Sequence, residues 1–122
     1  MDASYPETRR ERGEGGEELA ATYLKLAGFE ILERNLRLGR QEIDILARDG
    51  ACLVCVEVRL RRGDRCGRAA ESLNRGKLRA MRMGLRLALR ERNWRGDFRL
   101  DLIALDWRSD RSGLELAHYR GI

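Results

Sequence analysis

The sequence predicts an α/β domain in which two helices flank a sheet with a central antiparallel hairpin. Apolar residues recur at helical spacing in two segments, residues 13–28 and 72–92. Residues 41–62 read QEIDILARDGACLVCVEVRLRR, two apolar strands joined by the turn pair Asp-Gly. Further strands are expected in alternating or apolar runs at residues 29–35, 98–105 and 113–119.

The composition indicates one globular unit. A chain of 122 residues can bury one hydrophobic core and is too short for two independent ones. Charged residues make up 37% of the chain, but 43% is apolar and only one proline occurs, so wholesale disorder is excluded. We expect a flexible N-terminal arm at residues 1–12, where MDASYPETRRER is charged and aperiodic, and a single domain at residues 13–122.

The charge balance favours an anionic partner such as nucleic acid. The formal net charge is +5, and almost all cations are arginines, whose planar donors match phosphate. Codon usage is the competing explanation for the arginine bias. The cysteines, Cys52, Cys55 and Cys66, are odd in number and form no obvious disulfide framework, which suggests a reducing, cytoplasmic setting. No segment approaches the roughly 18 apolar residues of a membrane span.

The two helices have recognisable ends. The first begins at Gly13 and closes at Gly28, as a helix C-cap does. The second follows a glycine-dotted basic loop at residues 61–72, is capped by Ser72 or Asn74, and runs to about Arg92. One face of it is basic, and this face either tracks a phosphate backbone or is simply solvated. The basic face consists of Arg75, Arg79, Arg82, Arg86 and Arg90.

The hairpin has a definite expected register. A two-residue turn centred on Asp49 and Gly50 sets every cross-strand pair. On one face the expected pairs are apolar: Ile43 with Val56, Ile45 with Val54, and Ala47 with Cys52. On the other face they are Leu46 with Leu53, Asp44 with Cys55, Glu42 with Glu57, and Arg40 with Arg59.

This register crowds carboxylates. It places Glu42 directly opposite Glu57, with Asp44 one step along the same face, and like charges at that spacing destabilise a sheet. A hard divalent cation gathers carboxylate oxygens most naturally, although a shared proton or a neighbouring arginine would also serve. Arg59 projects from the same face as Glu57. Glu17, which borders the packed side of the first helix, is a further acid that can join them; the alternative is an ordinary exposed glutamate favoured at a helix start. A mixed-charge surface patch is the alternative.

Several motifs together match a known family. The segments GGEELAATYLKLAGFEILERN, QEIDILARDG, VCVEVRLRR, GKLRAM and FRLDLIAL follow one another over residues 13–105. In this order they resemble the bacterial YraN-like family of predicted endonucleases, which is similar to the Holliday-junction resolvases of the PD-(D/E)XK nuclease superfamily. The resemblance implies a restriction-endonuclease-like core, in which helices flank a mixed sheet and the acids lie on the central hairpin. The single domain would then be nuclease-like.

The resemblance also implies a site. The expected catalytic residues are Asp44, Glu57, Arg59 and Glu17. The expected ligands of Mg²⁺, or of Mn²⁺, are Asp44, Glu57, the Val58 carbonyl, Glu17 and Glu42. The expected nucleic-acid contacts are Arg61, Arg62, Arg65, Arg68 and Lys77. The expected function is endonucleolytic cleavage of DNA, including branched or junction DNA, by a homodimer.

One departure keeps an alternative open. Arg59 stands where the superfamily has a lysine, and arginine stays protonated, so it can stabilise charge but cannot accept a proton from water. A nucleic-acid-binding protein that retains the nuclease fold without turnover is therefore the second hypothesis. The third is an assembly domain whose basic surface binds an acidic protein.

Overall fold

The computed structural model describes residues 9–62, 69–108 and 112–122. These residues form two α-helices, one short 3-10 helix and five strands. In chain order the elements are α1 (Arg9–Leu26), β1 (Glu30–Leu38), β2 (Gln41–Asp49), β3 (Cys52–Arg62), η1 (Ala69–Ser72), α2 (Arg75–Glu91), β4 (Phe98–Trp107) and β5 (Leu114–Arg120).

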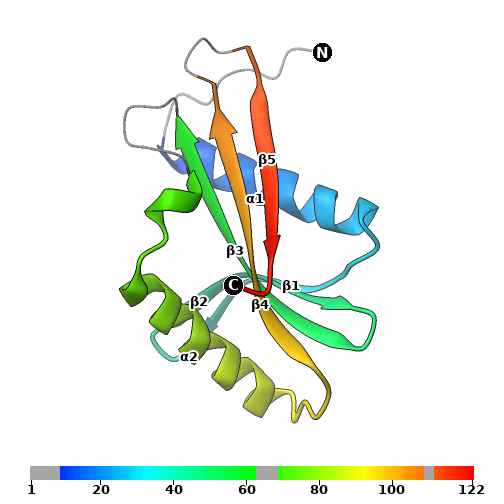
Figure 1. Ribbon diagram of the computed structural model, residues 1–122. Coiled ribbons are helices and arrows are strands. Elements are labelled where there is room, and N and C mark those ends of the chain that lie inside the picture. The colour runs from blue at the N-terminus through cyan, green and yellow to red at the C-terminus, as the bar shows by residue number, and fades with distance from the viewer. Residues whose placement is uncertain (1–8, 63–68, 109–111) are drawn as a thin grey trace.

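The strands form one sheet in the order β1-β2-β3-β4-β5, and the helices cover its opposite faces (Figure 1). All neighbouring strands are antiparallel except β3 and β4, which are parallel and joined through α2. The α/β fold predicted from the sequence, with a mixed sheet flanked by helices, is confirmed. Within the described ranges, no helix is long and apolar enough to cross a membrane.

Two hydrophobic clusters hold the three layers together. On one face α1 packs through Ala20, Ala21 and Leu24 against strand residues that include Ile45, Val54 and Ile103. On the other face α2 packs through Met81, Leu85 and Ala88 against Leu46, Leu53 and Leu100. The faces of β3 alternate as expected of a strand buried on both sides, because Cys52 packs against the α1 cluster and Cys55 belongs to the α2 cluster.

The first helix begins earlier than the sequence suggested. It starts at Arg9 instead of Gly13, so residues 9–12 are helical and were wrongly placed in the arm. Residues 1–8 of that arm lie outside the described residues. The predicted C-cap at Gly28 is confirmed, since this residue has a φ of 94° and the next amide, that of Phe29, donates to Leu24 O.

The second helix begins where the capping pattern indicated. The side chain of Asn74 accepts a hydrogen bond from Lys77 N at 2.9 Å, which satisfies one of the unpaired donors of the first turn. The helix ends at Glu91, and Asn93 then takes a positive φ of 51°. The cap therefore fixes the position of Lys77 on the side of the helix that faces the sheet.

The hairpin register differs by two residues from the predicted one. The structure pairs Asp49 with Cys52 and Ile45 with Val56, so the central turn residues are Gly50 and Ala51. Only Gly50 of this turn has a positive φ, 60°, as a type II′ turn requires, whereas the expected type I′ turn needs two such residues. The predicted opposition of Glu42 and Glu57 is therefore wrong. The observed ladder ends at the pair Ile45–Val56, and Asp44 and Glu57 are the next residue of each strand.

A shift of two residues leaves most side chains on their expected faces, because side chains alternate with period two. Ile43 is the exception. It packs in the α2 cluster, whereas Ile45 packs in the α1 cluster, so the alternation of β2 breaks around Asp44. Gly84 of α2 lies against this point, since a Cβ there would come within 3.3 Å of Ile43 Cγ1.

Candidate functional site

The site is built where β2 and β3 stop pairing through their backbones. Past the pair of Ile45 and Val56, the backbone N–H of Val58 donates to Asp44 Oδ2 at 2.9 Å. The carboxylate of Asp44 thus takes the position of a backbone acceptor between the two strands. It also lies close enough to the side chain of Glu57 for each acid to affect the pKa of the other. The two acids that the sequence singled out are brought together.

Glu57 is the most buried acid of this site. It is only 6% exposed, and two cations contact the same carboxylate oxygen. Lys77 Nζ lies 3.3 Å from Glu57 Oε2, and Arg59 Nε lies 3.1 Å from it. Arg59 comes from the same strand two residues on, whereas Lys77 comes from the first turn of α2. The expectation that Arg59 and Glu57 project together is met.

Burial and crowding raise the pKa values of both acids. Burial raises the pKa of Glu57 to about 7, and the negative charge of Asp44 adds to the effect, while Lys77 and Arg59 oppose it. Burial also raises the pKa of Asp44, against the hydrogen bond from Val58 N and the interaction with the Glu57 side chain. Near neutral pH the pair therefore holds a proton readily, and a nearby cation would displace it.

Glu17 approaches the pair from α1. The preceding residue, Gly16, is buried against Leu105 of β4 and Leu60 of β3, so this turn of α1 packs directly on the sheet. Glu17 is half-buried, and its pKa is raised first by burial and then by the charge of Asp44. This acid is thus close enough to Asp44 to sense its charge.

Glu42 lies at the edge of the site. It is exposed and its carboxylate binds Arg37 Nη2 at 2.9 Å. It nevertheless lines, with Glu57 and Met81, a small cavity of about 10 Å³. Among residues 9–62, 69–108 and 112–122, no three His, Cys, Asp or Glu side chains are arranged to hold a metal ion. The site offers a carboxylate pair, with Glu17 and Glu42 further out.

Arg59 has an unsatisfied donor. Its Nε is buried and, although close to Glu57, makes no hydrogen bond within the described part of the chain. A buried N–H without an acceptor is costly, so this group would gain from an additional oxygen brought to the site.

The predicted nucleic-acid contacts are only partly described. Arg61 is half-buried near the end of β3. The side chain of Arg62 and all of Arg65 and Arg68 lie outside the described residues. Lys77 belongs to the acidic site through its ion pair with Glu57. All five arginines of the basic face of α2 are exposed.

Comparison with known proteins gives the family. Residues 16–105 match the model of the uncharacterised protein family UPF0102. A UPF0102 protein of Anaeromyxobacter sp. strain Fw109-5 is 37% identical over 114 residues, which cover 93% of this chain and 84% of the relative. One from Herpetosiphon aurantiacus is 36% identical over 119 residues, covering 93% and 94%. One from Dehalococcoides mccartyi is 39% identical over 109 residues, covering 88% and 90%.

The chain belongs to the UPF0102 family. This is the YraN-like family that the motifs indicated, so that part of the resemblance is confirmed. The region matched by the UPF0102 model contains all the acids of the site together with Arg59 and Lys77. The family is described as uncharacterised, so membership by itself carries no activity.

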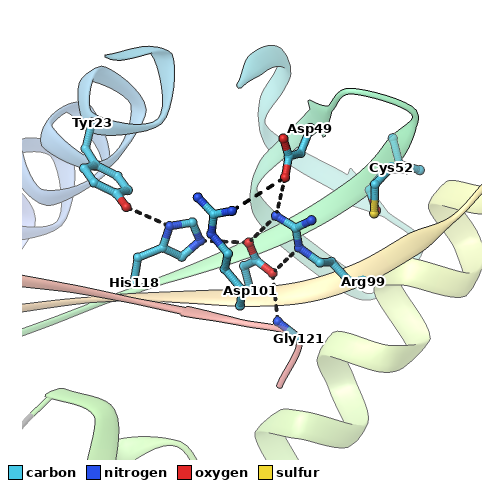
Figure 2. Close-up of polar contacts among 9 residues, drawn as sticks. Tyr23, Asp49, Cys52, Arg99, Asp101, His118 and Gly121 are labelled. Carbon is cyan, nitrogen blue, oxygen red and sulfur yellow. Dashed lines mark hydrogen bonds and ion pairs between the residues drawn. The ribbon is translucent and has the colours of Figure 1, made fainter. Parts of the chain in front are cut away.

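A second polar network of this UPF0102 chain was missed by the sequence analysis (Figure 2). Asp101 on β4 is fully buried and accepts hydrogen bonds from Arg99 Nε at 2.9 Å and from Gly121 N at 3.1 Å. His118 Nε2 lies 2.8 Å from Asp101 Oδ2, and His118 Nδ1 lies 2.9 Å from the hydroxyl of Tyr23. The network ties α1, β4 and the end of β5 together. The sequence feature that could have indicated this network is the aspartate inside the apolar run FRLDLIAL.

Proposed function

We propose that this chain is a divalent-metal-dependent endonuclease acting on DNA, including branched or junction DNA. The observation that carries the proposal is the meeting of Asp44 and Glu57 at the point where β2 and β3 separate. A protein that only grips phosphate gains nothing from two partly buried carboxylates in contact, because they repel the ligand and cost stability. Their conjunction with Arg59 and Lys77 fits a site for hydrolysis of phosphodiesters.

The residues present fit Mg²⁺ or Mn²⁺. Mg²⁺ is commonly held by one or two carboxylates, with water and substrate phosphate completing its coordination, so a carboxylate pair is a sufficient protein contribution. Asp44 and Glu57 would hold the ion, with the Val58 carbonyl as a further oxygen donor and Glu17 and Glu42 acting from further out. The bound ion would supply positive charge at the scissile phosphate and favour ionisation of water.

The two cations divide the remaining work. Lys77, held beside Glu57 from the first turn of α2, is suited to orient the attacking water or to contact the phosphate. Arg59 cannot lose its proton, but its buried Nε lacks an acceptor and is suited to stabilise negative charge on the phosphate as it is attacked. Lys77 thus compensates, from α2, for the lysine that β3 lacks.

The basic surface supplies the grip on DNA. A backbone-reading enzyme needs phosphate contacts more than base contacts. We assign this role to the four arginines that follow the site in the sequence, Arg61, Arg62, Arg65 and Arg68. The proposal includes a homodimer, since an enzyme with two-fold symmetry can cut two strands of a junction.

A second candidate is a nucleic-acid-binding protein without turnover. The ion pairs of Glu57 favour it, because Lys77 and Arg59 already neutralise the carboxylate that a metal would need.

The test is a cleavage assay with duplex, single-stranded and four-way-junction DNA in Mg²⁺ and in Mn²⁺. We expect cleavage by the wild type, and a loss of at least roughly tenfold to a hundredfold in Asp44→Asn and in Glu57→Gln. Glu91→Gln, which removes an exposed acid at the end of α2, should cleave normally. Equal cleavage by all variants would mean contamination and end the proposal. Binding by the wild type without cleavage would support the second candidate.

A further inference from the structure

A second cavity lies at the other end of α2, away from the carboxylate pair. It is about 510 Å³ and is formed by the β2–β3 turn and the loop between α2 and β4. This loop is yellow in Figure 1 and lies at the end of the sheet where β3 and β4 begin. Trp94, Arg95, Asn93 and Arg48 line the cavity. It is a shallow depression, largely open to solvent, so a flat group could lie against its wall without being enclosed.

The cavity is firmly constructed. Trp94 N donates to Leu89 O at 2.9 Å, and Trp94 Nε1 donates to Asp97 O at 2.8 Å, so both the backbone and the indole are fixed. Leu53 N also donates to Asp97 O at 2.9 Å, which ties the loop to β3. Gly96 packs tightly here, because a Cβ there would come within 3.1 Å of Ala51 O and 3.3 Å of Trp94 Nε1.

The lining has the chemistry of a nucleotide site. The indole N–H is already satisfied, so the ring is left to act as an apolar surface on which a base can stack. Arg95 is exposed, and its guanidinium can bind phosphate. The amide of Asn93, also exposed, can both donate to and accept from a base edge.

The arginines that line the cavity are not strongly neutralised by acidic side chains, so they can bind a phosphate. Arg48 is paired with Glu30 at 3.3 Å, but both side chains are about half exposed or more, and such a surface pair is weak and easily exchanged. Asp49, the acid of the turn, is directed instead at Arg99, with Nη2 at 2.9 Å (Figure 2).

We propose that this cavity binds an unpaired nucleotide of the DNA, with its base on Trp94 and its phosphate between Arg48 and Arg95. The inference rests on the proposed function, which makes DNA the substrate. It adds that this DNA carries an unpaired nucleotide. Lys77 lies two residues into α2, and the helix from Lys77 to its end at Glu91 spans roughly 21 Å. At 3.4 Å per nucleotide along one strand, the unpaired nucleotide lies roughly six nucleotides from the scissile phosphate.

The experiment follows the fluorescence of Trp94. Trp107 is the other tryptophan and is only 6% exposed, so the Trp107→Phe protein reports on Trp94 alone. It is titrated, in EDTA so that no turnover occurs, with a DNA duplex carrying one extrahelical nucleotide and with the same duplex fully paired. We expect quenching and roughly tenfold tighter binding for the first duplex.

Two variants in this background locate the effect. Arg95→Ala should bring the affinity for the bulged duplex to within about twofold of that for the paired duplex, since stacking alone holds the base less well. Arg108→Ala removes an exposed arginine at the other end of β4 and should retain the preference. Thermal melts of both variants check that the fold is unchanged.

Equal affinity for the two duplexes, or binding without quenching, would overturn the inference. Quenching by AMP with no gain from DNA would assign the cavity to a free nucleotide and also overturn it. The proposed nuclease activity is tested separately, by the cleavage assay in Mg²⁺. Cleavage without quenching refutes only the proposed binding of a nucleotide in the cavity. Quenching without cleavage in any metal refutes only the proposed nuclease activity.

Discussion

Glu57 shows how one residue concentrates the chemistry of this site. Its carboxylate is nearly buried, contacts a second acid and is held by two cations from different elements. Lys77 and Arg59 each offset part of the cost of burying the charge of Glu57, whereas the charge of Asp44 adds to it. A carboxylate in this balance responds to protonation or to a bound cation far more than an exposed acid does.

This balance predicts an unusual dependence of stability on pH. The folded-state pKa of Glu57, about 7, is above its ordinary value of 4.5, so folding is favoured by the protonated carboxyl. The contribution is fully present below about pH 4.5 and is lost as the pH rises through about 7. The wild type should therefore lose on the order of 1 to 3 kcal/mol relative to Glu57→Gln between pH 5 and pH 8. Urea unfolding at both pH values measures the difference.

The exposed acid Glu91 is the control, since Glu91→Gln should follow the wild type at both pH values. A difference between wild type and Glu57→Gln that stays constant with pH, or grows in favour of the wild type at pH 8, would contradict the assigned environment of Glu57.

At the scale of single elements, the β2–β3 turn sets the register of the two strands and so brings Asp44 and Glu57 together. Gly50 has a φ of 60°, a conformation that costs an L-residue roughly 1–2 kcal/mol. Gly50→Ala should destabilise the protein by about that amount. Gly15→Ala is the matched change: nothing lies within 4 Å of its Cβ, and alanine should stabilise the exposed helix by up to about 1 kcal/mol. Opposite signs in chemical denaturation are expected, and equal signs would refute the turn assignment.

The elements were largely readable from the sequence because their ends are marked by single residues. Gly28 and Asn74 have local signatures that do not depend on the rest of the chain. The register was not, because Asp-Gly and Gly-Ala both satisfy a two-residue turn and only the packing of the strands selects one.

The acidic pair could be predicted, and its surroundings could not. Asp44 and Glu57 are close in sequence and joined by one hairpin, so even a register wrong by two residues leaves them neighbours. Lys77 reaches Glu57 only because α2 packs on the sheet beside it. His118 and Asp101 come from different strands, and their contact depends on the pairing of β4 with β5.

At the scale of the whole molecule, the three-layer fold puts a candidate site with polar side chains at each end of α2. The carboxylate pair lies near the first turn of this helix, and the cavity of Trp94 lies beyond its last turn. On the opposite face of the sheet, the network around Asp101 fixes α1 to β4 and β5. The length of α2, 17 residues, thus sets the separation between the two candidate sites.

The most direct test of the central claim is calorimetric titration of Mn²⁺ and of Mg²⁺ into the wild type at pH 8, where most of Glu57 is ionised. One ion should bind per chain, the binding should be lost in Asp44→Asn and in Glu57→Gln, and Glu91→Gln should retain it. A wild type that binds neither ion even with DNA present, or binding that survives both substitutions, would contradict the assignment of these two carboxylates as a cation site.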